Sequence, residues 1–390
     1  MAPVALINGR VLTPKGIVEG AAVLVENGRI VTLRPAAKIS RGTARYDLDG
    51  GLLAPGFIDA QVNGGGGVLF NDDPSVEAID AIGRAHRRFG TTGFLPTLIS
   101  EDLDTVARAI EATRRAIEAG VPGVLGVHIE GPFLNAERKG AHDARKFRTL
   151  DERAFQLLAS LRTGCTLVTL APEKTTPAMI RRLSQAGVIV SAGHTDASYR
   201  EANAALDAGM SGFTHIFNAM SPLTSRAPGA VGAALEHQDS WCGMIVDGRH
   251  VDPAVLRIAL KCKPRDRFLL VTDAMPTVGA PRKTFQLQGR TVTVRNGVCV
   301  APDGTLAGSN LDMAQSVRNA VAMLGVTVED ALAMAASHPA QFLRLGRLGA
   351  IAAGNRADLV LLDDALGVRE TWIGGVANQR DGARRSKRLA

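Results

Sequence analysis

The sequence is poor in cysteine and in aromatic residues. It has 4 cysteines in 390 residues, and aromatic side chains make up 4% of the chain. The cysteines are too far apart to form a CxxC zinc knuckle or redox pair. Few aromatic rings also disfavour a protein that stacks on nucleic-acid bases. We therefore expect reduced thiols and no nucleic-acid partner.

Long apolar runs are also missing. A membrane-spanning helix shows as about 18 or more consecutive apolar residues, and no such run occurs here. The first residues, MAPVALINGR, have neither the basic nor the apolar segment of a secretory signal peptide. The expectation is a cytoplasmic protein without a membrane partner.

The charge balance is mildly basic. The chain has 45 basic and 38 acidic residues, which gives a net charge of +7. Part of the excess lies near the C-terminus, where we predict a disordered tail over 381–390, because chain ends are poorly ordered unless they are tied down. A nucleic-acid surface would need basic residues arranged on one face. The basic residues of the tail region are Arg380, Arg384, Arg385, Lys387 and Arg388.

Both ends of the chain are rich in β-like segments. Asn8-Gly9 and Asn27-Gly28 each separate two alternating apolar runs, a pattern typical of β-hairpins. Two further β-like runs, 357–363 and 370–378, stand near the C-terminus. We predict one small β-sandwich domain assembled from residues 1–52 and 346–380.

The middle of the chain alternates apolar runs with segments of helical period, and several of these segments end in glycine, as helices commonly do. Apolar strands alternating with helices indicate a parallel sheet. We predict a closed (β/α)₈ TIM barrel over 53–345, a size that suits this fold. The predicted strands lie in 52–63, 91–99, 123–131, 165–173, 188–195, 212–218, 241–248 and 267–275.

Polar residues stand where these strands end. Glu130, His194, His215 and Asp273 end predicted strands 3, 5, 6 and 8, at the barrel face that carries active sites. Two imidazoles and a carboxylate are a common ligand set for catalytic zinc with one position left for water. A further carboxylate beside the water can move a proton to a leaving amine. The sequence therefore predicts metal-assisted amide hydrolysis. Other polar residues at strand ends are Asp59, Gln61, Asn63, Asp247 and His250.

These residues lie in motifs that resemble the amidohydrolase superfamily and, within it, the N-acetylglucosamine-6-phosphate deacetylases. The resemblance covers nearly the whole chain, and its most distinctive strings are HIEGPFLNAERKGAH (128–142) and GFTHIFNAMSP (212–222). Other matching segments are PGFIDAQVNGGGG (55–67), GTTGFLPT (90–97), SAGHTDA (191–197), DGRHV (247–251), VTDAM (271–275) and GTLAGSNLDM (304–313). It implies hydrolysis of the N-acetyl amide of N-acetylglucosamine 6-phosphate to glucosamine 6-phosphate and acetate, in amino-sugar catabolism and cell-wall recycling.

The resemblance also implies residue roles. Glu130, His194 and His215 match the metal ligands, Asp273 matches the catalytic acid/base, and His142 matches the residue that orients and polarises the acetyl group. The family forms homodimers, and the arginine that matches Arg226 reaches the phosphate in the neighbouring subunit. The remaining matches to substrate contacts are Ala141, Asn218, Ala219, Asp247, Gly248, Arg249 and His250, with Leu306, Ala307 and Gly308 in the loop that closes over the substrate.

One position departs from the superfamily pattern. Many amidohydrolases have His-x-His after strand 1 and bind two metal ions, whereas this chain has Gln61-Val62-Asn63. Neutral amides are poorer zinc ligands than imidazoles. We therefore expect one divalent ion, Zn²⁺ first, with Fe²⁺, Co²⁺ or Mn²⁺ as alternatives. Gln61 and Asn63 would then lie in its outer shell or touch the substrate.

Several residues have less specific interpretations. We predict a tight loop at 64–67 rather than a phosphate cradle, a packing or outer-shell role for His128, a surface position for His86 and a core position for Cys242. Two alternatives stay open for the whole protein. The first alternative is a deacetylase of a related sugar such as N-acetylgalactosamine 6-phosphate. The second is a relative without catalytic activity that serves as a binding protein.

Overall fold

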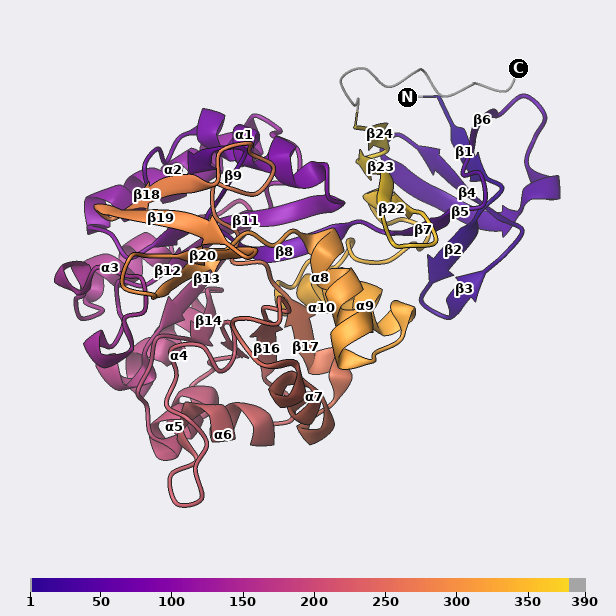
Figure 1. Ribbon diagram of the computed structural model, residues 1–390. Helices are drawn as coiled ribbons and strands as arrows, with labels where there is room; N and C mark the ends of the chain where they lie inside the picture. Colours follow the sequence, from indigo (N-terminus) through magenta and orange to yellow (C-terminus); the bar gives the residue numbers. More distant parts are fainter. Residues whose placement is uncertain (1, 379–390) are drawn as a thin grey trace.

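The computed structural model describes residues 2–378, and the predicted tail at 381–390 lies outside the described residues. Its centre is a parallel eight-stranded sheet in the order β17-β16-β15-β14-β13-β12-β11-β8 (Figure 1). Backbone hydrogen bonds from Asp273 to Gln61 and from Asn63 to Ala274 join the two ends of this sheet. The TIM-barrel prediction is confirmed. The barrel strands are β8 (Phe57–Val62), β11 (Thr91–Ile99), β12 (Gly126–Glu130), β13 (Cys165–Leu170), β14 (Ile189–Ala192), β15 (Gly212–Phe213), β16 (Trp241–Met244) and β17 (Phe268–Leu270).

Amphipathic helices surround the barrel strands, and their ends follow the sequence signals. Ser75, Asp151, Thr176 and Ser198 each cap the first turn of a helix through a side-chain oxygen. α1, α2, α4 and α5 are each followed within three residues by a glycine with positive φ, in agreement with the glycines expected at helix ends. The helices are α1 (Val76–Arg87), α2 (Leu103–Glu118), α3 (Glu152–Leu158), α4 (Pro177–Gln185), α5 (Tyr199–Asp207), α6 (Gly229–Glu236), α7 (Pro253–Cys262), α8 (Met313–Asn319), α9 (Val328–Ala335) and α10 (Ser337–Phe342).

Two sheets lie beside the barrel (Figure 1). The first, in the order β5-β4-β1-β6, consists of N-terminal strands, and the second, in the order β24-β23-β22-β7-β2-β3, combines strands from both chain ends. Apolar residues from both sheets, including Val23, Leu53 and Trp372, form one buried cluster, as in a small β-sandwich. The exact domain boundaries remain a prediction. The strands are β1 (Val4–Ile7), β2 (Arg10–Thr13), β3 (Gly16–Val18), β4 (Ala21–Glu26), β5 (Arg29–Pro35), β6 (Ala44–Asp47), β7 (Leu52–Pro55), β22 (Leu359–Leu362), β23 (Val368–Ile373) and β24 (Val376–Ala377).

Two details of the sandwich differ from the sequence prediction. Asn27-Gly28 turns the β4–β5 hairpin as expected, but the hairpin predicted at Asn8-Gly9 is wrong. That dipeptide carries the chain from β1 in one sheet to β2 in the other, because β1 pairs with β4 and β6, whereas β2 pairs with β3 and β7. The predicted run 52–63 also divides into β7, in the sandwich, and β8, in the barrel.

An antiparallel sheet that the sequence did not predict follows the last barrel strand. We call its four strands the insert sheet: β18 (Thr284–Leu287), β19 (Arg290–Arg295), β20 (Val298–Val300) and β21 (Leu306–Ser309). It lies over the barrel near β9 (Gly64–Gly65), β10 (Val68–Leu69) and β11 in Figure 1. Arg290 donates to the backbone carbonyl of Ala141 (2.8 Å), and Gln288 donates to that of Ser100 (3.1 Å). The insert sheet is thereby fixed to loops at the mouth of the barrel.

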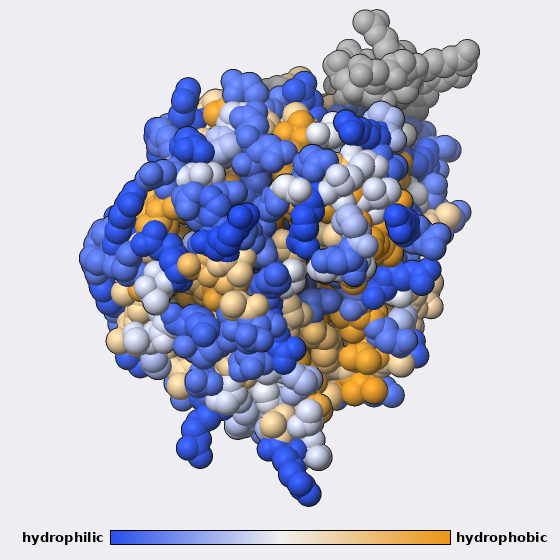
Figure 2. Space-filling model, turned by 60° about the vertical axis from the view of Figure 1, so that its left-hand side comes forward, coloured by the Kyte–Doolittle hydropathy of each residue, from blue (hydrophilic) through white to orange (hydrophobic). Residues whose placement is uncertain are grey.

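Figure 2 shows one face of the molecular surface. The face shown in Figure 2 is largely hydrophilic, and its apolar side chains gather in smaller areas. Among residues 2–378, no helix has the length and apolar character needed to cross a membrane. The cytoplasmic location expected from the sequence remains a prediction.

Candidate active site

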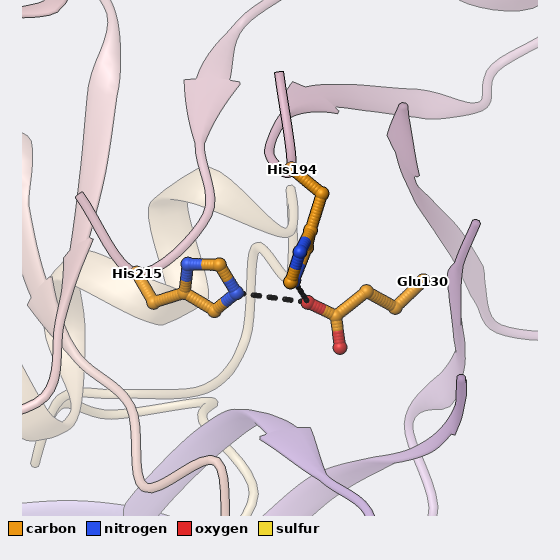
Figure 3. Close-up of side chains that lie close together, drawn as sticks. All are labelled: Glu130, His194 and His215. Atoms are coloured by element: carbon orange, nitrogen blue, oxygen red, sulfur yellow. Dashed lines mark hydrogen bonds and ion pairs between the residues drawn. The ribbon is translucent and has the colours of Figure 1, made fainter. Parts of the chain in front are cut away.

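Three side chains from separate barrel strands meet at the mouth of the barrel. Glu130 ends β12, His194 follows β14 and His215 follows β15. One oxygen of Glu130 lies 2.9 Å from His215 Nε2 and 3.4 Å from His194 Nε2. Figure 3 shows the two rings and the carboxylate pointing toward one another. Their ligand atoms all lie within 4.8 Å of one another, a spacing that suits a single metal ion.

The backbone at the site is held in an unusual conformation. His194, His215 and Asp273 have φ values of +48°, +33° and +52°, in the left-handed region that residues with a Cβ rarely adopt. Such residues cost on the order of 1–3 kcal/mol each and cluster at active sites. Because each follows a barrel strand, this conformation determines how its side chain leaves the strand end.

The electrostatics of the three residues suit a cation. Burial alone would raise the pKa of Glu130, but the adjacent His194 and His215 rings hold that pKa well below its usual range. His194 Nδ1 lies 2.8 Å from the backbone carbonyl of Arg138, which can only accept, so Nδ1 carries the proton. Its Nε2 is then free to bind a metal, and such outer hydrogen bonds commonly orient metal-ligating histidines.

A second carboxylate, Asp273, lies next to these ligands. Asn63 Nδ2 and Gln61 Nε2 donate to its Oδ1 at 2.6 and 3.2 Å, and Gln61 Nε2 also lies 3.1 Å from Glu130 Oε2. Burial, followed by repulsion from Glu130, raises the pKa of Asp273 to about 6. The Gln61 amide therefore connects the predicted proton shuttle to the predicted ligand Glu130.

His142 stacks near the metal ligands as a neutral ring. Its ring centroid lies 4.3 Å from that of His194, and Ser100 contacts its Nδ1 through both the hydroxyl (2.8 Å) and the backbone N–H (3.4 Å). A backbone N–H can only donate, so Nδ1 accepts and the ring proton is on Nε2. Burial and repulsion from His194 hold the pKa of His142 well below its usual value. His142 can therefore donate a hydrogen bond without carrying a charge.

A cavity of about 340 Å³ opens above this cluster. Most of the predicted site residues line it: Glu130, Ala141, His142, His194, His215, Asn218, Ala219, His250, Asp273, Leu306 and Gly308. The sequence reasoning missed further lining residues, namely Ile99, Glu137, Arg138, Gly140, Ile245, Met275 and Thr305. Arg138 and Gly140 lie inside the predicted 128–142 motif, which was a usable signal, whereas Ile99 and Ile245 have no feature that separates them from core residues.

Some predicted substrate contacts lie outside this lining. Asp247 instead fixes His250, because its Oδ2 lies 2.6 Å from His250 Nδ1 and its Oδ1 accepts from the backbone N–H groups of Arg249 and His250. Ala307 is fully buried. Arg226 is exposed on the loop between β15 and α6 and does not line the cavity of its own chain.

The prediction that His86 lies on the surface is wrong. Its side chain is fully buried between α1 and the glycine-rich β9–β10 hairpin, and its Nε2 lies 2.9 Å from the carbonyl oxygen of Gly64. A Cβ at Gly65 would come within 2.8 Å of the ring, so the glycines make the space for it. The predictions for the tight loop at 64–67 and for a buried Cys242 are confirmed.

Comparison with known proteins agrees with this geometry. The model of the Amidohydrolase family matches residues 52–378.

The chain belongs to the amidohydrolase family.

Two relatives resemble it over nearly their full length. The N-acetylgalactosamine-6-phosphate deacetylase of Shewanella sp. is 42% identical over 94% of this chain and 93% of its own. The N-acetylglucosamine-6-phosphate deacetylase of Haemophilus influenzae is 35% identical over 95% of this chain and 98% of its own. The crystal structure of N-acetylglucosamine-6-phosphate deacetylase from Pasteurella multocida superposes with a TM-score of 0.94 at 35% identity, and covers 97% of this chain and 100% of that one.

The residues of this amidohydrolase fit the metal ion that its family uses. Two imidazole nitrogens and one ionised carboxylate converge, which is the donor set of a catalytic zinc site with an open position. Gln61 and Asn63 bond through their amide groups to Asp273. This arrangement supports the expectation that they lie outside the ligand shell.

Proposed function

We propose that this amidohydrolase hydrolyses the N-acetyl amide of N-acetyl-D-glucosamine 6-phosphate, releasing acetate and D-glucosamine 6-phosphate. The observation that carries the proposal is the convergence of Glu130, His194 and His215 beside Asp273 at the floor of the cavity. The relatives that match across the whole chain are deacetylases of hexosamine 6-phosphates. We further propose one metal ion per chain, Zn²⁺ first and Fe²⁺, Co²⁺ or Mn²⁺ as alternatives.

The metal is proposed to bind to Glu130, His194 and His215. A divalent ion there supplies Lewis acidity, which polarises an amide carbonyl and makes water a better nucleophile near neutral pH. His142, with its proton on Nε2, donates a hydrogen bond to the acetyl carbonyl oxygen and so orients the amide. His250, which Asp247 fixes and which also lines the cavity, is proposed to contact the sugar.

Asp273 is proposed as the group that moves the proton. Both amide donors contact its Oδ1, which leaves Oδ2 for proton transfer. The carboxylate takes a proton from the attacking water and gives it to the departing nitrogen, because an amine anion is too basic to leave. A pKa of about 6 suits both steps near neutral pH.

Arg226 is proposed to bind the substrate phosphate across a homodimer. It is exposed and lies outside the cavity of its own chain, which leaves it available to a neighbouring subunit. A guanidinium pairs bidentately with phosphate oxygens. Asn218, Ala219, Leu306, Ala307 and Gly308 complete the proposed sugar-binding region.

The 4-epimer is the second candidate substrate. The Shewanella relative, with 42% identity, acts by name on N-acetylgalactosamine 6-phosphate. Acetate release should be measured with both sugar phosphates and with unphosphorylated N-acetylglucosamine. The proposal expects the highest kcat/KM with N-acetylglucosamine 6-phosphate. A higher value with the galactosamine epimer would reassign the substrate, and no acetate from any of the three would reject the deacetylase function.

A further inference from the structure

A chain of buried polar side chains crosses the barrel interior below the ligand cluster. Thr97, His128, Thr169, Ser191 and Thr214 belong to it, and the exposed fraction of each residue is between 0 and 7%. They come from neighbouring barrel strands or directly follow them, namely β11, β12, β13, β14 and β15 in that order. Burying a polar group costs free energy unless the group is hydrogen-bonded. We therefore ask which hydrogen bonds these five side chains make.

The members are bonded in sequence across the strands. Thr97 Oγ1 accepts from the backbone N–H of Val62 (2.9 Å) and lies 3.4 Å from His128 Nδ1. His128 Nε2 lies 2.8 Å from Thr169 Oγ1, which lies 2.7 Å from Thr214 Oγ1. Thr214 in turn donates to Ser191 Oγ at 2.8 Å. The chain is therefore continuous from β8 to the end of β15.

The direction of these bonds follows from counting protons. A hydroxyl has one proton, and that of Thr214 goes to Ser191. Thr169 must therefore donate to Thr214, and His128 must donate to Thr169 through a protonated Nε2. His128 is thus the first donor in the chain. Thr169 accepts from His128 and donates to Thr214, which joins β12 to the strands that follow.

Each metal-ligand strand is attached to this chain close to its ligand. His128 stands two residues before Glu130 on β12, and both side chains point into the barrel because alternate residues share a face. Ser191 stands three residues before His194, and Thr214 directly precedes His215. A bond between these members therefore sets how far each ligand-bearing strand end can shift relative to the other two.

We propose that the His128–Thr169–Thr214–Ser191 chain positions the three metal ligands, with His128 and Thr169 as positioning residues. This inference rests on the metal site of the proposed function. Replacing outer groups that orient metal ligands commonly lowers metal affinity by about 10–100-fold. A group that acts by setting ligand geometry should change metal affinity more than it changes the stability of the metal-free fold.

Thr169→Val tests the proposal, because valine has nearly the shape of threonine but neither donates nor accepts. Thr169→Ser keeps the hydroxyl and should restore the wild-type value. Thr113→Val is a matched control, since Thr113 is also fully buried and its hydroxyl donates to Ala109 within α2 rather than to a residue of a barrel strand. The Kd for Zn²⁺ is measured on metal-free protein by competition with a chelating dye, and Tm is measured on the same samples.

We expect Thr169→Val to weaken Zn²⁺ binding by about 10–100-fold, with Thr169→Ser and Thr113→Val within about threefold of wild type. The proposal is overturned if Thr169→Val lowers Tm but leaves the Kd for Zn²⁺ close to the wild-type value, as is expected of the control. If that variant does not fold, the pair His128→Gln, which keeps a donor, and His128→Leu, which does not, takes its place under the same criteria. A wild-type protein that binds no Zn²⁺ would instead reject the metal site of the proposed function.

Discussion

Asp273→Asn is the substitution that tests the proposed chemistry most directly. The change keeps the size and the Oδ1 acceptor that Asn63 Nδ2 contacts at 2.6 Å, so the local geometry can persist. It removes the ability to accept a proton. Burial and the Glu130 charge raise the pKa of Asp273 to about 6, which is still below 7. The wild-type enzyme therefore has its base ready at neutral pH, whereas the variant has none.

The expected loss follows from that difference. General acid–base catalysis contributes about 10²–10⁴-fold, which corresponds to about 2.7–5.4 kcal/mol in activation free energy. We expect kcat for acetate release to fall at least 100-fold, about the lower limit of that range, while KM and metal content change little. The limb of the pH–kcat/KM profile that reports Asp273 should also disappear.

A competing role for Asp273 gives a different result. If Asp273 is a metal ligand, the asparagine variant should lose metal, and added Zn²⁺ should restore activity. The assay is therefore acetate release while the purified variant is titrated with Zn²⁺, with bound metal determined in the same samples. Recovery to near wild-type rates would refute the proton-shuttle reasoning.

Three further predictions concern the phosphate, the metal and the buried histidine. Arg226→Ala should raise KM strongly for the phosphorylated sugar and far less for N-acetylglucosamine; an equal loss for both would assign Arg226 to the fold or to an interface. Metal analysis of purified protein should find one divalent ion per chain, and full occupancy by two ions would contradict the single site. Burial lowers the pKa of His86 from 6.5 to about 4, so below pH 6.5 the unfolded chain takes up a proton that the folded chain does not. Stability should therefore decrease between pH 6.5 and 4, by up to about 1.4 kcal/mol per pH unit, and His86→Gln should reduce the slope in urea unfolding; an unchanged slope would contradict the assignment.

The barrel and the residues of its candidate metal site were predictable because they depend on local sequence patterns. Apolar runs such as 91–99 coincide with a barrel strand, β11. The polar residues that end other runs, Glu130, His194 and His215, line the cavity at the active-site mouth. Glu130, His194 and His215 could be placed together from strand order alone, since the ends of parallel strands meet at one edge. The predicted ligand cluster and the observed one therefore consist of the same residues.

Two of the errors have a common physical cause. His86 stands beside Arg87 and Arg88 in a helix, which indicates a surface position, but its burial depends on a glycine hairpin more than 20 residues away in sequence. Asn8-Gly9 has hairpin composition, yet β1 takes its partners from β4 and β6. For His86 and for Asn8-Gly9 the outcome is decided by a long-range partner that local patterns do not identify. The insert sheet is a different case: its strands pair with their neighbours in sequence, and Asn296-Gly297 lies between the paired residues Arg295 and Val298, so a local hairpin signal was present but was not used.

The buried polar chain shows this limit most clearly. Thr97, Thr169, Ser191 and Thr214 each stand inside or beside an apolar run, where one hydroxyl does not disturb a strand pattern. Their bonds join residues 23 to 45 positions apart, so no spacing rule reveals them. These side chains meet only when the strands close into a barrel and their inward faces come together. Only then does each hydroxyl have a hydrogen-bond partner. The sequence specifies the ligands by where strands end, whereas the device proposed to hold them in register arises from the barrel interior as a whole.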